Sequence, residues 1–137
     1  MADVNDFNQT VIDEFRANDG KVGGQFQGAP LLLLNTVGAK SGQPRTHPVV
    51  YLADGDRIVI FASKAGAPDS PAWYHNLVAN PRVTVELGAE QFAATAHVVE
   101  GAERDRLFAA QVKVMPGFQA YQDNTTRVIP VVALTRD

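Results

Sequence analysis

A loop with two cations is the part of this chain best suited to chemistry. Residues 38–45 read Gly-Ala-Lys-Ser-Gly-Gln-Pro-Arg and place Lys40 and Arg45 five positions apart between two apolar runs. Glycines let a backbone approach a ligand closely, and a Lys and an Arg on one loop can bind phosphate or carboxylate groups. A solvated turn with two ordinary surface cations is the alternative that this pattern leaves open.

The same loop is not a nucleotide-binding P-loop. That motif needs a glycine directly before its lysine, and it opens a helix. Here Ala39 precedes Lys40, and Pro44 disfavours a helical conformation at Gln43. An ATP or GTP site is therefore excluded.

Composition narrows the class of protein further. The 137 residues suffice for one domain with a proper core. Twelve Lys and Arg residues against 15 acids give a net charge of −3, which disfavours a nucleic-acid partner. The lack of cysteine excludes disulfides and thiolate chemistry, and the histidine spacing predicts no metal site. The sequence shows neither a signal peptide nor a membrane-spanning run, so we expect a cytoplasmic protein.

The first residues predict a helix that packs on the rest of the domain. Val4, Phe7, Val11 and Phe15 follow helical spacing over residues 4–18, and a Gly-rich linker comes next. Residues 1–28 thus form an N-terminal helix and linker, and residues 29–137 form the main body of a single domain. Five acids and one base among the first twenty residues disfavour contact with a membrane surface.

The remaining pattern predicts an α+β fold built on a small barrel. We expect strands at residues 31–36, 45–53, 57–62, 83–87, 92–99 and 128–134, helices at 71–79 and 102–114, and an irregular segment at 115–123. Six short, mostly hairpin-linked strands fit an antiparallel barrel with flanking helices better than a Rossmann sheet.

Several other side chains could serve a site at the end of this barrel. Ser63 and Lys64 leave the third strand just before a helix whose N-terminus favours anions. Trp73 either packs in the core or forms a flat wall for a planar ring. His47 has either a structural role or an acid–base role. The segment from Met115 to Tyr121 is either a lid over a pocket or an ordinary loop.

These motifs together resemble the deazaflavin-dependent nitroreductases, which use coenzyme F420. The resemblance is carried, in order, by residues 36–45, 62–64, 71–77 and 80–81, and by the ending at 127–132. It extends from about residue 31 to the C-terminus. Members of that family fold as a split β-barrel related to FMN-binding reductases, so the resemblance implies the same fold here.

The resemblance also implies a role for each matching residue. Lys40 and Arg45 would bind the phosphate and polyglutamate tail of the coenzyme, and Trp73 would lie beside the deazaflavin. The implied coenzyme-binding residues are Ala39, Lys40, Ser41, Arg45, Thr46, His47, Pro48, Val49, Val50, Phe61, Ala62, Ser63, Lys64, Ala72, Trp73, Tyr74 and Asn76.

The implied reaction is hydride transfer from the reduced deazaflavin to a small, flat, electron-poor acceptor: a quinone, an activated enone or a nitroaromatic compound. Tyr121 would donate a proton or orient the substrate, Ser63 would be the second catalytic residue, and Trp73, Met115, Phe118 and Tyr121 would line the substrate pocket. Nitro-reducing members tend to carry several tyrosines where this chain has Met115 and Phe118, which disfavours nitro reduction.

Two alternatives stay open at this point. One is an FMN-dependent reductase of the same fold, and the other is a non-catalytic carrier of a coenzyme or small ligand. The expected assembly is a monomer or a homodimer.

Overall fold

The computed structural model describes residues 4–18, 31–55, 57–62, 72–125 and 128–136. The expected linker after the first helix falls outside these ranges. Along the chain lie α1 (Val4–Ala17), β1 (Leu31–Val37), β2 (Pro44–Asp54), β3 (Arg57–Phe61), α2 (Ala72–Ala79), β4 (Arg82–Leu87), β5 (Glu90–Val99), α3 (Gly101–Val114), α4 (Gly117–Asp123) and β6 (Val131–Arg136).

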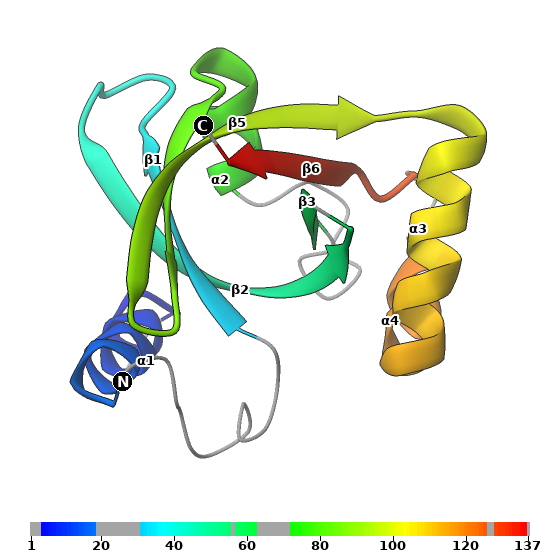
Figure 1. Cartoon of the computed structure of the whole chain (residues 1–137), viewed down its shortest axis with the longest axis horizontal. Coiled ribbons are helices and arrows are strands. Elements are labelled where there is room, and N and C mark those ends of the chain that lie inside the picture. The colour runs from blue at the N-terminus through cyan, green and yellow to red at the C-terminus, as the bar shows by residue number, and fades with distance from the viewer. Residues whose placement is uncertain (1–3, 19–30, 56, 63–71, 126–127, 137) are drawn as a thin grey trace.

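The six strands close into one antiparallel barrel (Figure 1). Its strand order is β1-β2-β3-β6-β5-β4, and β4 pairs with β1 to complete the circle. Consecutive strands form the hairpins β1–β2, β2–β3 and β4–β5, whereas β6 returns to pair with both β3 and β5. The predicted six-stranded antiparallel barrel with flanking helices is confirmed.

The start of β1 shows how one strand serves two cores. Residues 31–34 are four consecutive leucines, and all are buried. Because side chains alternate across a strand, Leu32 and Leu34 point into the barrel, while Leu31 and Leu33 pack against Phe15 and its neighbours on α1. An unbroken apolar run is typical of a strand covered on both faces.

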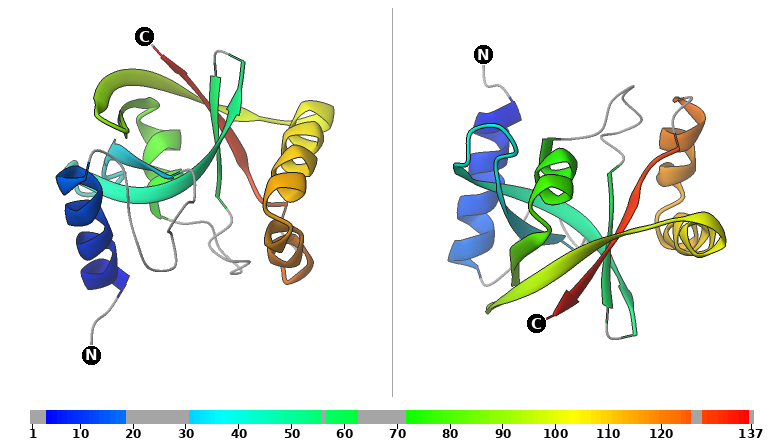
Figure 2. Two further views of the ribbon diagram at one scale, coloured as in Figure 1. Left: turned by 60° about the horizontal axis from the view of Figure 1, so that its bottom comes forward. Right: turned by 90° about the horizontal axis from the view of Figure 1, so that it is seen from above.

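Helices cover the barrel on two sides and at one end. Figure 2 shows α1 and the α3–α4 pair on opposite sides of the barrel, with α2 between them. α2 closes one end of the barrel, since Trp73 and Leu77 pack among the strand side chains that point into the barrel, such as Leu32 and Leu34. We call this cluster the inner core. No helix in the described part of the chain is long and apolar enough to cross a membrane.

Two sequence predictions about the C-terminal third are wrong. The segment expected to be irregular contains α4, because Phe118 and Tyr121 lie three residues apart and pack together. They join the outer core, which is the apolar cluster that α3 and α4 form with the outer face of the barrel. Pro116, just before that helix, already has φ −57°. The last strand begins at Val131 rather than Val128, since Pro130 has no N–H to donate to a sheet.

Candidate functional site

The loop between β1 and β2 is held in shape by its own hydrogen bonds. The Gly38 amide donates to the Gln43 carbonyl oxygen at 2.8 Å, and the Gly42 amide donates to the Gly38 carbonyl oxygen at 3.0 Å. The Gln43 amide donates to the Ser41 hydroxyl oxygen at 3.2 Å. Gly42 has φ +70°, and a Cβ on Gly38 would lie 2.5 Å from Ser41 Oγ. Gly42 therefore suits the left-handed backbone of this turn, and a side chain at position 38 would have to displace the Ser41 hydroxyl.

Asn76 fastens this loop to α2. Its Oδ1 accepts a hydrogen bond from the Ala39 amide at 2.9 Å, and its Nδ2 donates to the Thr36 hydroxyl at 3.1 Å. Asn76 and Thr36 are both buried. The hydrogen bonds of the Asn76 side chain thus hold the loop in place, and the Ala39 amide already has a partner.

The two loop cations are free of acidic partners in the part of the chain that the structure describes. Arg45 and Lys40 are both exposed, and Arg45 Nη1 reaches only the adjacent Pro44 carbonyl, at 3.4 Å. Other described arginines are paired, as in the Arg57–Asp54 contact at 2.7 Å. Two unpaired cations on one fixed hairpin can receive an anion. Lys64, the predicted third cation, and Ser63 lie outside the described residues.

In the described part of the chain, the strand that follows the loop has an open edge. β2 pairs with β1 along residues 44–50, but its pairing with β3 covers only Tyr51 to Asp54. Among the described residues, the first seven residues of β2 therefore have one strand neighbour. Alternate N–H and C=O groups of such a stretch point away from the sheet and can bind a ligand. Thr46, His47, Pro48, Val49 and Val50, all predicted to bind the coenzyme, lie here.

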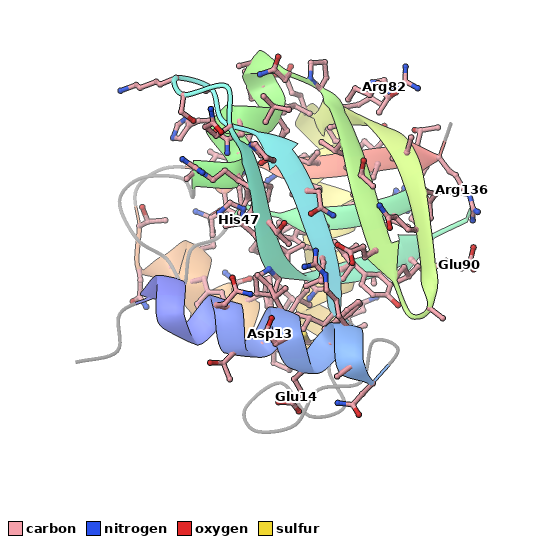
Figure 3. The ribbon with its side chains drawn as sticks, turned by 90° about the vertical axis from the view of Figure 1, so that its left-hand side faces the viewer. Asp13, Glu14, His47, Arg82, Glu90 and Arg136 are labelled. Atoms are coloured by element: carbon pink, nitrogen blue, oxygen red, sulfur yellow. The ribbon has the colours of Figure 1, made fainter. Side chains whose placement is uncertain are left out.

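His47 brings an unsatisfied polar atom to this edge (Figure 3). Its Nδ1 is buried without a hydrogen-bond partner in the described structure. Alternation along β2 puts Arg45 and His47 on the same side as Val49, whose side chain belongs to the inner core. Burial lowers the pKa of the His47 imidazole, and the Arg45 cation lowers it further, so a neutral ring is favoured.

Trp73, the residue predicted to form an aromatic wall, is more deeply buried than its neighbours on α2. Trp73 is only 5% exposed and packs in the inner core, whereas Ala72 is exposed and Tyr74 is half-buried. Tyr74 lines a cavity of about 370 Å³ together with Pro130. The Pro130 carbonyl oxygen accepts a hydrogen bond from the Ala62 amide at 3.0 Å, so this cavity adjoins the end of β3.

The predicted substrate residues of the C-terminal half gather on the outer core. Phe118 is buried with its ring edge-on to Phe61 at a centroid distance of 5.7 Å, and Tyr121 tilts against Phe118 at 5.1 Å. Met115 packs on the same cluster, and its sulfur accepts from Gln111 Nε2 at 3.4 Å. Met115 and Tyr121 are the more accessible members, while Trp73 belongs to the other core.

Sequence reasoning missed two residues that shape this site. Thr36 receives the Asn76 bond, and Asn35 accepts a 2.6 Å hydrogen bond from the Thr46 hydroxyl. Their signal in the sequence was a polar pair at the end of the leucine run of β1. A polar pair in an otherwise buried strand indicates hydrogen-bonded side chains.

The closed six-stranded barrel and the helices that cover it define a protein of the split-barrel fold. A family model described as F420H(2)-dependent quinone reductase matches residues 8–136. The chain belongs to this family.

Individual relatives agree with that assignment. The F420H(2)-dependent quinone reductase Rv1261c of Mycobacterium tuberculosis is 44% identical over 126 residues, covering 89% of this chain and 85% of the relative. A solved structure described as an F420-H2 dependent reductase (FDR-A) is 38% identical, with a TM-score of 0.70 over 77% of this chain and 93% of its own. Another, described as a domain-swapped dimer, is 35% identical, with a TM-score of 0.72 over 92% of each chain.

Proposed function

We propose that this protein binds coenzyme F420 at the barrel end closed by α2 and transfers a hydride from the reduced coenzyme to a quinone. Family membership supports the type of reaction. The observation that carries the location is the pair Lys40 and Arg45, which have no acidic partner among the described residues and lie on a fixed hairpin beside the first half of β2.

The residues present fit a coenzyme with a flat ring and an anionic tail. Lys40 and Arg45 would hold the negative groups, because charge-assisted hydrogen bonds to phosphate or carboxylate are the strong ones. The open edge of β2 would supply backbone groups, and the buried Nδ1 of His47 has no hydrogen-bond partner among the described residues. Ser63 and Lys64 complete the predicted set.

The protein's share of the reaction is placement. When bound, the reduced deazaflavin supplies the hydride, and the quinone must also gain a proton to become a hydroquinone. Tyr121 is the candidate proton donor, and its ring is held against Phe118. Holding donor and acceptor in line is where such an active site gains most of its rate.

Calorimetric titration with oxidised F420 tests the proposed binding site. Loss of one charge-assisted contact costs about 1.5 to 3 kcal/mol, so Lys40→Ala and Arg45→Ala should each weaken binding by roughly 10- to 150-fold. Lys113→Ala is a matched control, because Lys113 is also exposed and has no acidic partner among the described residues, yet lies on α3. Its affinity should stay within twofold of the wild type.

The outcomes separate the candidate functions. Tight F420 binding that falls with added salt, together with oxidation of F420H2 by a water-soluble naphthoquinone, supports the proposal. Binding of FMN in place of F420 would assign the protein to the flavin branch of the fold. Binding without turnover would indicate a carrier, and equal losses in all three variants would disprove the proposed anion site.

A further inference from the structure

A continuous line of hydrogen bonds runs from α1 to the open half of β2. Arg16 donates through Nε and Nη2 to the two carboxylate oxygens of Glu86 at 3.0 and 2.9 Å. Asn35 Nδ2 donates to Glu86 Oε2 at 2.9 Å, and the Thr46 hydroxyl donates to Asn35 Oδ1 at 2.6 Å. This Arg16–Thr46 network consists of Arg16, Glu86, Asn35 and Thr46, and it joins α1, β4, β1 and β2.

The geometry fixes each member of the network. The Arg16–Glu86 pair is bidentate, and the Glu86 side chain is only 15% exposed. The Arg16 hydrogen bond holds the pKa of Glu86 below its ordinary value, and the Asn35 bond acts in the same direction against the effect of burial. Asn35 Nδ2 also reaches the Thr84 carbonyl oxygen at 3.3 Å. The Asn35 amide therefore cannot turn over without losing both its donor and its acceptor contacts.

The network ends where the strand has least support. Thr46 lies directly opposite Asn35 in the β1–β2 ladder, within the part of β2 that has no described partner on its other edge. A strand held on one edge keeps more freedom than one held on both. The Thr46–Asn35 bond ties this stretch to β1 through side chains as well as backbone, between Arg45 and His47.

We propose that the Arg16–Thr46 network positions the first half of β2 for coenzyme binding, so that α1 acts on the site through these hydrogen bonds as well as through its apolar packing against Val50. This inference rests on the proposed function. Arg16, Glu86 and Asn35 are positioning residues, since each acts through Thr46. Their contribution is to hold the strand in its binding geometry before the coenzyme arrives, which lowers the ordering cost of binding.

Two substitutions test the network at different points. Asn35→Leu removes its three side-chain hydrogen bonds at similar size. Arg16→Met removes the bidentate pair at a side chain that is 49% exposed. Arg136→Met is the matched control, because Arg136 forms another exposed pair with Glu90, at 3.1 Å. That pair joins β5 and β6 at the edge of the barrel away from His47 (Figure 3).

Hydrogen exchange measures the strand without coenzyme, and titration measures the consequence. We expect the amides of residues 44–50 to exchange faster in Asn35→Leu and, to a lesser degree, in Arg16→Met. The Kd for F420 and the KM for F420H2 should rise about 5- to 20-fold in the first and two- to fivefold in the second, with kcat within twofold of the wild type. Arg136→Met should change none of these quantities.

Each result decides the inference. Faster exchange with weaker coenzyme binding supports it. Unchanged exchange, or faster exchange with unchanged Kd, overturns it, because the network would then not set the binding geometry. A wild-type protein that fails to bind F420 at all would instead disprove the proposed function, and the exchange measurement would still show whether the network holds β2.

Discussion

Replacing Asn76 with alanine tests whether this residue anchors the β1–β2 loop or binds the coenzyme. The resemblance placed Asn76 among the coenzyme-binding residues, whereas the structure commits its amide to the Ala39 N–H at 2.9 Å and the Thr36 hydroxyl at 3.1 Å. If Asn76 is an anchor, its loss should destabilise the protein and loosen the loop that carries Lys40. If it binds the coenzyme, its loss should reduce affinity without changing stability.

The expected loss of unfolding free energy follows from the two hydrogen bonds of Asn76. Each contributes about 1 kcal/mol net, and leaving the buried Thr36 hydroxyl unsatisfied adds about 1 to 2 kcal/mol. Water can reach the exposed Ala39 amide, so its penalty is smaller. We expect Asn76→Ala to lose about 3 to 4 kcal/mol of stability, which for a domain of this size lowers Tm by roughly 10 to 14 °C.

Urea unfolding measures the free energy, and F420 titration of the folded variant measures the affinity. Val78→Ala is the control on the same helix, because Val78 is 56% exposed and should cost no more than about 0.5 kcal/mol. Thr36→Val removes one of the two bonds and should fall between them. An Asn76→Ala protein with wild-type stability and an affinity lowered more than tenfold would refute the anchor.

Two further predictions concern the β1–β2 loop and the first half of β2. Because the folded-state pKa of His47 is lowered, the unfolded chain binds more protons as pH falls through 6.5, so stability should decrease between about pH 7 and 5. His47→Gln should flatten this part of the curve of unfolding free energy against pH, and an unchanged slope would contradict the assignment. Gly38→Ala must displace the Ser41 hydroxyl and should weaken F420 binding several-fold in the same titration, whereas Gly117→Ala, with open space around its Cβ, should not.

The barrel could be predicted from the sequence because local sequence patterns indicate its strands. Short apolar runs bounded by turns locate all six strands, and the helical spacing of Val11 and Phe15 locates α1. α4 was missed because its Pro116-Gly117 start is typical of a loop. Its helix is favoured by burial of Phe118 against Phe61, a contact between segments far apart in the sequence.

The site was only partly predictable. Residue types and spacing predicted the cationic loop, because glycines with a lysine and an arginine in one short turn can bind an anion. The open edge of β2 depends on where its pairing with β3 ends, and the role of Asn76 depends on how α2 packs on β1. Both are tertiary facts that a single sequence does not encode in any local pattern.

An acidic protein can still receive an anionic coenzyme, because local pairing outweighs net charge. The chain carries a net charge of −3, but many of its described carboxylates are already matched by arginines, as in Arg16–Glu86 and Arg57–Glu103. At physiological salt, charges beyond about 8 Å are largely screened. A ligand at the hairpin therefore senses mainly Lys40 and Arg45, which have no acidic partner among the described residues. A net negative charge disfavours a nucleic-acid partner, but it does not exclude a small anion.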